Sequence, residues 1–144
     1  MIDESKLSSA SSSAHTSLEA KALAAQGRAY APYSKFAVGA AIRMDGEEFT
    51  GINVENASYG LGVCAERTAV FNAVNAGRKT LEEVAVATHA SPPSSPCGAC
   101  RQVLLEFAAD PARVTITALN PRGERRSWTL AELIPDGFSG RELP

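Results

Sequence analysis

The chain of 144 residues has no hydrophobic run long enough to span a membrane and no large excess of charge of either sign. Its formal net charge of −2 argues against the basic face that nucleic-acid binding requires. Residues 1–14 are rich in Ser and Ala but lack the basic and apolar regions of a secretory signal. We therefore expect a soluble protein with a flexible tail over residues 1–14 and one domain over residues 15–144, with neither a membrane nor a nucleic acid as partner.

Cysteine is scarce, and its placement is uneven. The 3 cysteines lie in two short motifs, Cys64-Ala65-Glu66-Arg67 and Pro96-Cys97-Gly98-Ala99-Cys100. An odd number of cysteines without an export signal favours metal ligands in a reducing cytoplasm over a disulfide framework. The two histidines, His15 and His89, lie outside both motifs and are interpreted as structural.

The hydrophobic pattern predicts helices and strands that alternate after an initial hairpin. Val84 to Ala87 is apolar on both faces, which suits a central strand covered on each side by helices. The predicted fold is α/β, a three-layer α/β/α sandwich around a five-stranded mixed sheet. The expected elements are a helix capped by Thr16 and Glu19 that runs to about Tyr30, strands over 36–42 and 49–54 joined by an Asp45-Gly46 turn, a helix over 64–77, a strand over 84–87, a helix over 97–108, strands over 114–118 and before Trp128, and a short helix capped by Thr129 and Glu132.

The spacing of the cysteines predicts a zinc site with an open position. Cys97 and Cys100 are three residues apart at a helix start, so both sulfurs can reach one ion from one helical face. Cys64 opens another helix, and the free N–H groups of a first turn favour thiolates at both places. Three protein ligands are typical of catalytic zinc, whereas structural zinc is usually closed by four. Arg67, three residues after Cys64, is positioned to donate to a thiolate.

Glu66 is the candidate proton carrier beside the metal. It follows Cys64 by two residues, and on a regular helix this spacing points the two side chains to different faces. Spacing alone therefore does not bring Glu66 to the metal. The two side chains can converge if Cys64 occupies the non-helical cap position.

Two other classes of protein remain open on the cysteines alone. A noncatalytic, zinc-stabilised interaction module would need a fourth protein ligand and no position for water. A redox dithiol at Cys97 and Cys100 would leave Cys64 and Glu66 without a role.

Four runs of the sequence, in this order and spacing, resemble the short-chain cytidine deaminases, and the match extends over about residues 20–138. The runs are Tyr33 to Gly39, Asn53 to Ala57, Cys64 to Thr68 and Pro96 to Gln102. The resemblance implies one Zn²⁺ per subunit, held by Cys64, Cys97 and Cys100. It implies hydrolytic deamination of cytidine and 2′-deoxycytidine to uridine and 2′-deoxyuridine with release of ammonia, a reaction of pyrimidine salvage. In that chemistry zinc hydroxide attacks C4 of the pyrimidine while Glu66 shuttles protons to N3 and to the departing amine.

The same resemblance implies the substrate contacts and the assembly. Asn53 and Glu55 would bind the ribose hydroxyls, which favours an ordinary nucleoside over another aminopyrimidine nucleoside such as an antibiotic. Members of the family are usually homotetramers in which aromatic residues of neighbouring subunits complete each pocket. The remaining implied residues are Phe36 against the base, the N–H groups of Ala65 and Glu66 toward the base carbonyl O2, Arg67 and Gln102 behind the metal ligands, and Tyr59 and Phe138 as the aromatic residues from neighbouring subunits.

Overall fold

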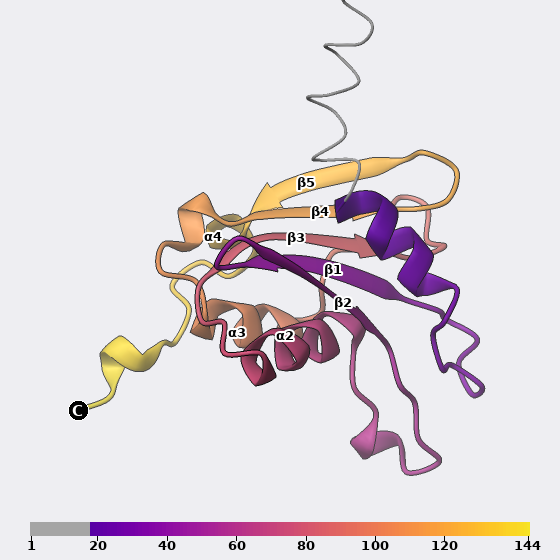
Figure 1. Ribbon diagram of the computed structural model, residues 1–144, viewed down its shortest axis with the longest axis horizontal. Helices are drawn as coiled ribbons and strands as arrows, with labels where there is room; N and C mark the ends of the chain where they lie inside the picture. Colours follow the sequence, from indigo (N-terminus) through magenta and orange to yellow (C-terminus); the bar gives the residue numbers. More distant parts are fainter. Residues whose placement is uncertain (1–17) are drawn as a thin grey trace, which may run out of the picture.

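A five-stranded mixed sheet forms the middle layer of the structure, a computed structural model that describes residues 18–144 (Figure 1). The strand order is β2-β1-β3-β4-β5. β1 is antiparallel to β2 and β3, β3 is parallel to β4, and β4 is antiparallel to β5, which confirms the predicted mixed sheet. The strands are β1 (Gly39–Met44), β2 (Glu47–Ile52), β3 (Leu81–Ala87), β4 (Thr115–Leu119) and β5 (Arg125–Thr129).

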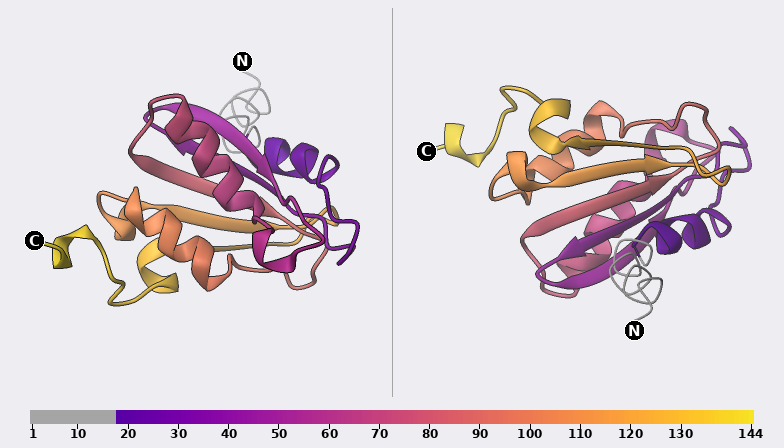
Figure 2. Two further views of the ribbon diagram at one scale, coloured as in Figure 1. Left: turned by 90° about the horizontal axis from the view of Figure 1, so that it is seen from below. Right: turned by 90° about the horizontal axis from the view of Figure 1, so that it is seen from above.

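Helices cover both faces of this sheet. Helices α2 (Ala65–Asn75) and α3 (Gly98–Glu106) lie on one face, and the helix over residues 18–26 lies on the other (Figure 2). The central strand β3 serves both layers because its side chains alternate. Val84 and Val86 join the larger core under α2 and α3, while Ala85 and Ala87 pack in the smaller core that contains Leu18. The predicted three-layer sandwich is confirmed.

Two glycines let the helices pack directly on the backbone of the sheet. A Cβ at Gly39 of β1 would lie 2.2 Å from the carbonyl oxygen of Ala22, in the helix over residues 18–26. A Cβ at Gly51 of β2 would lie 2.3 Å from the carbonyl oxygen of Ala65, the first residue of α2. Both separations are far shorter than any side chain tolerates. The start of α2 is therefore fixed against β2 at backbone distance.

The hairpin between β1 and β2 turns as predicted. Asp45 and Gly46 both have positive φ, 49° and 79°, as the two central residues of a type I′ turn require. At the other end of the chain, Thr129 accepts a hydrogen bond from the Glu132 N–H at 3.2 Å and caps the short helix α4 (Leu130–Leu133). Both local signals are confirmed.

The first predicted helix and strand have different bounds in the structure. The helix ends at residue 26, not near Tyr30, because Gly27 follows it and Tyr30 pairs with another segment. The Tyr30 N–H donates to the Asn53 carbonyl at 3.0 Å, and its carbonyl accepts from Glu55 at 2.9 Å. The strand begins at Gly39, so residues 33–38 form a loop. The predicted tail over 1–14 and the Thr16 cap lie outside the described residues.

The basic residues Arg125 and Arg126 of β5 each have a partner. Arg125 pairs with Glu19, and the Arg126 guanidinium lies 4.6 Å from the centre of the Trp128 ring. These contacts bring a carboxylate to one guanidinium group and an aromatic ring to the other. Within residues 18–144, the helices are too short or too polar to cross a bilayer.

Candidate active site

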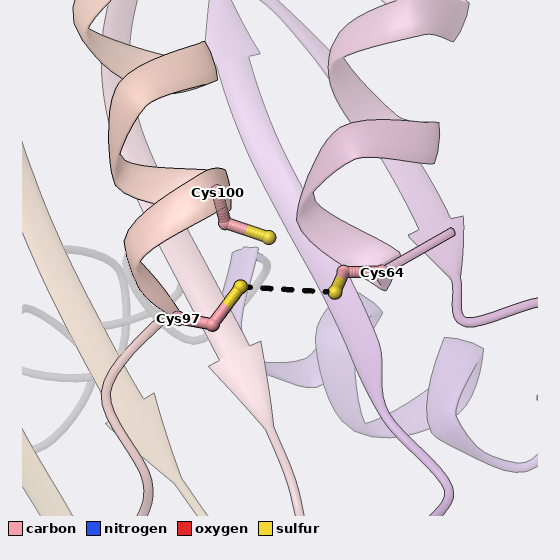
Figure 3. A group of neighbouring side chains, drawn as sticks. All are labelled: Cys64, Cys97 and Cys100. Atoms are coloured by element: carbon pink, nitrogen blue, oxygen red, sulfur yellow. Dashed lines mark hydrogen bonds between the residues drawn. The ribbon is translucent and has the colours of Figure 1, made fainter. Parts of the chain in front are cut away.

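Three thiols converge where α2 and α3 begin. Cys64 is the N-cap of α2 and Cys97 is the N-cap of α3, both with an extended backbone, and Cys100 lies within the first turn of α3. The three sulfurs lie within 4.8 Å of one another. Figure 3 shows the three side chains pointing toward one another between the two helices, with 3.9 Å between the sulfurs of Cys64 and Cys97. The structure thus brings together the three predicted ligands.

The donor set of this cluster fits zinc. Three thiolates are soft ligands, and three protein ligands with a fourth position open to water are typical of catalytic zinc. Among residues 18–144, the group of potential ligand atoms at this point consists of the 3 cysteines, without a histidine or carboxylate. The fourth protein ligand that a closed structural site needs is therefore not supplied by the described residues.

The charge of the cluster is balanced by a neighbouring cation. The Arg67 Nη2 donates to the Cys64 sulfur at 3.2 Å, as the three-residue spacing predicts. Hydrogen bonding from Cys100, followed by that from Arg67, lowers the pKa of Cys64 to about 5 against the opposing effect of burial. The hydrogen bond with Cys64 and burial raise the pKa of Cys100. Cys64 is therefore a thiolate at neutral pH, the form that binds metal.

Glu66 is brought to the same site by the cap at Cys64. Because Cys64 lies outside the regular helix, its sulfur and the Glu66 carboxylate line one pocket of about 290 Å³, together with Cys97. Only 4% of Glu66 is exposed, and this burial is the largest cause of its raised pKa.

Asn53 holds the loop over residues 33–38 against the end of β2. Its side-chain amide Nδ2 donates to the Phe36 carbonyl at 2.7 Å, and its Oδ1 accepts from the Val38 N–H at 2.9 Å. Phe36 lines the same pocket as Glu66 and Cys97. Asn53, which is predicted to contact the sugar, therefore fixes the backbone of Phe36, which is predicted to pack on the base.

Glu55 holds the other end of this loop. Its Oε1 accepts from the N–H groups of Tyr33 and Ser34, at 3.0 and 3.1 Å, and its Oε2 accepts from the Ser34 hydroxyl. The Ser34 hydroxyl in turn accepts from the Phe36 N–H at 3.0 Å. Hydrogen bonds from Ser34 are the largest cause of the lowered pKa of Glu55. The carboxylate is therefore ionised and fixed at the pocket rim.

The pocket widens toward the surface on the side of Tyr59. A second hollow of about 420 Å³ shares Ser34, Asn53, Glu55 and Cys64 with the first. Tyr59 lines this outer hollow, contacts the Tyr33 ring edge-on at 6.0 Å between centroids, and is 81% exposed. The site therefore extends from the buried carboxylate to an open aromatic rim.

Phe138 and Gln102 lie apart from this pocket within one chain. The Phe138 side chain is 59% exposed and lines neither hollow. The Gln102 Nε2 donates to the Phe138 carbonyl at 2.8 Å. Gln102 thus contacts the C-terminal segment, and within residues 18–144 none of its hydrogen bonds supports the predicted place behind the cysteines.

Two residues of the site were missed by sequence reasoning. Ser34 lies in a quoted run, but no spacing rule links its hydroxyl to Glu55, which is 21 residues away. Arg101 follows a metal ligand directly, yet one of its partners, Leu133, is 32 residues away. Neither contact has a local signal, because each depends on how separate loops meet.

A cluster of three cysteine sulfurs without a fourth protein ligand among the described residues, a buried carboxylate beside it and an adjoining pocket are together typical of a zinc enzyme that acts on a small molecule. The profile of the "Cytidine and deoxycytidylate deaminase zinc-binding region" family matches residues 12–117. Cytidine deaminase from Halalkalibacterium halodurans is 44% identical over 124 residues, which cover 85% of this chain and 92% of that protein.

Solved structures agree with the sequence matches. The crystal structure of cytidine deaminase from Burkholderia pseudomallei aligns with a TM-score of 0.80 and 46% identity, covering 86% of this chain and 98% of that chain. That of cytidine deaminase from Mycobacterium tuberculosis aligns with a TM-score of 0.73 and 41% identity, covering 86% and 96%. The chain belongs to the cytidine deaminase family of zinc enzymes.

Proposed function

We propose that this enzyme hydrolyses cytidine and 2′-deoxycytidine to uridine and 2′-deoxyuridine with release of ammonia. The observation that carries the proposal is the buried carboxylate of Glu66 in one pocket with Cys64 and Cys97. A redox dithiol at Cys97 and Cys100 would leave the Glu66 carboxylate without a role, and likewise Cys64 with its hydrogen bond from Arg67. Both are accounted for by a hydrolytic zinc site.

Cys64, Cys97 and Cys100 hold the metal in this proposal. When bound, zinc supplies the Lewis acidity that activates water for attack on the base. Arg67 withdraws charge from the Cys64 sulfur through its hydrogen bond, which keeps three thiolates from quenching that acidity. The N-terminal turns of α2 and α3 act in the same direction.

Glu66 carries protons in the reaction. Deamination forms a bond from oxygen to C4 of the pyrimidine and breaks the bond from C4 to the exocyclic nitrogen, so one water is consumed and one ammonia leaves. The Glu66 carboxylate takes the two protons of that water one after the other, and it delivers one to N3 and one to the departing nitrogen. Burial raises its pKa toward the range in which it can both accept and donate.

The remaining pocket residues bind the nucleoside. Asn53 and Glu55 are proposed to meet the ribose hydroxyls, Phe36 to pack on the base and the Ala65 N–H to bond the base carbonyl O2. The carboxylate of Glu55 would repel a 3′-phosphate, which favours a free nucleoside over a nucleotide in a strand. The two predicted aromatic residues, Tyr59 and Phe138, complete the pockets of neighbouring subunits in a homotetramer.

The setting of the reaction is proposed as well. Residues 15–144 act as one zinc-dependent domain, in agreement with the single sheet that carries the site. Three unpaired thiols suit a reducing cytoplasm. There the products would enter pyrimidine salvage.

The test compares ammonia release from cytosine, cytidine, deoxycytidine and cytidine monophosphate, with zinc content measured in parallel. We expect release from both nucleosides. Glu66→Gln should retain zinc and lower kcat at least about 1,000-fold, because the isosteric amide cannot carry the proton. Full activity of that variant, or turnover of an unrelated aminopyrimidine nucleoside in preference to cytidine, would contradict the proposal.

A further inference from the structure

The loop that leads into Cys97 lacks support from its own backbone. Among residues 18–144, no hydrogen bond between two backbone groups involves the segment 90–96. Three of its residues, Pro92, Pro93 and Pro96, have no N–H to donate. The segment must therefore be held in place by side chains from elsewhere.

Arg101 supplies the support next to the metal ligand. Its Nε donates to the Pro96 carbonyl at 2.7 Å, and its Nη2 donates to the Ser95 hydroxyl at 2.9 Å. Pro96 directly precedes Cys97, and Ser95 lines the pocket that contains Glu66. The guanidinium thus fixes both the approach of the chain to a zinc ligand and part of the pocket wall.

The same guanidinium reaches the C-terminal part of the chain. Its Nη1 donates to the carbonyl of Leu133, the last residue of α4, at 2.7 Å. The neighbouring Gln102 holds the Phe138 carbonyl. The start of α3 therefore presents metal ligands toward Cys64, and its residues Arg101 and Gln102 donate hydrogen bonds to the segment 133–138.

We infer that Arg101 is a positioning residue that fixes the loop 95–97 and joins it to the end of α4, so that the zinc centre and the C-terminal segment stabilise each other. The inference rests on the proposed role of Cys97 as a zinc ligand. Arginine suits this position because its planar group offers donors in several fixed directions, whereas a lysine ammonium is a single point on a flexible stem. In the structure the Arg101 guanidinium already donates to three separate acceptors, namely the Pro96 carbonyl, the Ser95 hydroxyl and the Leu133 carbonyl.

The first experiment measures zinc release into excess chelator from the wild type, Arg101→Lys and Arg101→Ala. We expect release about 10-fold faster in both variants, since partners behind metal ligands typically contribute that much to affinity. Arg122→Ala is the matched control, because Arg122 lies on the surface and pairs with Glu124 at 3.6 Å. Its release rate should equal that of the wild type. Circular dichroism checks that each variant is folded. If the alanine variant is unfolded, the comparison rests on the lysine variant, which retains the positive charge.

The second experiment measures hydrogen exchange in a peptide over residues 130–143, whose amides at Ile134, Glu142 and Leu143 are hydrogen-bonded. Zinc removal from the wild type should accelerate exchange there, as should both Arg101 variants with zinc bound. Gln102→Ala should accelerate exchange in this peptide and speed zinc release by less than either Arg101 variant does, because it frees only the Phe138 carbonyl and leaves the loop 95–97 bound. Unchanged exchange on zinc removal, or zinc release from the Arg101 variants within twofold of the wild type, would overturn the inference. A wild type that neither holds zinc nor deaminates cytidine would instead refute the proposed function.

Discussion

The hydroxyl of Ser34 joins both predicted sides of the substrate pocket. It donates to Glu55 and accepts from the Phe36 N–H. In Ser34→Ala we expect KM for cytidine to rise about 5- to 10-fold, the effect of one or two lost hydrogen bonds, with kcat within twofold because Glu66 and the cysteines are untouched. Steady-state kinetics on the zinc-loaded enzyme measures both constants.

Ser127→Ala is the matched control for this variant. Ser127 also forms a hydrogen bond through its hydroxyl, to Thr117 at 3.0 Å, but on strand β5 and outside the pocket residues. Its KM should equal that of the wild type. An equal rise in KM for both variants, or a fall in kcat with unchanged KM in Ser34→Ala, would show that Ser34 does not organise substrate binding.

At this scale the sequence predicted what depends on regular spacing. The sulfurs of Cys97 and Cys100 meet at one point, and Arg67 reaches Cys64, as the three-residue spacing predicts, although Cys64 and Cys97 are N-caps with an extended backbone. Glu66 could not be placed in this way, because its position depends on the extended backbone of Cys64 at the cap. The contacts of Ser34 and Arg101 were not predictable, since their partners come from distant loops.

At the scale of elements, the contact between β2 and α2 decides where the site lies. A Cβ at Gly51 would lie 2.3 Å from both the Ala65 carbonyl oxygen and the Ala69 nitrogen, and backbone atoms cannot rotate away. In Gly51→Ala, α2 must shift with the Cys64 cap and Glu66. We expect a loss of about 1–3 kcal/mol in the free energy of unfolding and weaker zinc binding.

Denaturant unfolding and zinc titration measure these two effects in the same samples. Gly140→Ala is the control, because a Cβ there meets no atom within 4 Å and φ is not positive. Its unfolding midpoint and zinc affinity should match those of the wild type. If Gly51→Ala behaved like this control, β2 would not set the position of α2.

The elements themselves were largely predictable, and the errors have one physical cause. Helices α2 and α3 and the doubly buried strand β3 follow from hydrophobic periodicity. The first helix ends early and the first strand starts late because Tyr30 bonds the chain near Asn53, and Asn53 holds Phe36 in a loop. Such tertiary hydrogen bonds override the local preference for helix or strand, and the hydrophobic periodicity of the sequence does not reveal them.

On the scale of the whole molecule, one chain leaves several large apolar side chains exposed. Tyr59 is 81% exposed at the outer hollow, and Phe138 is 59% exposed on the C-terminal segment. The side chains of Phe71 and Leu61 are also exposed, at 52% and 68%. Large exposed aromatic side chains are typical of contact surfaces. This supports the proposed homotetramer.

Mixing two defective variants tests whether Phe138 serves a neighbouring pocket. Glu66→Gln lacks the proton carrier but retains Phe138, and Phe138→Ala retains Glu66 and should lose about 10-fold in kcat/KM. In an equimolar mixture refolded together with zinc, half of the sites carry Glu66, and half of those receive Phe138 from the other variant. Activity should therefore rise above that of either parent to about a quarter of the wild type. If Phe138 acted on the pocket of its own chain, no intact site would form, and the mixture would show only the mean of the two parents.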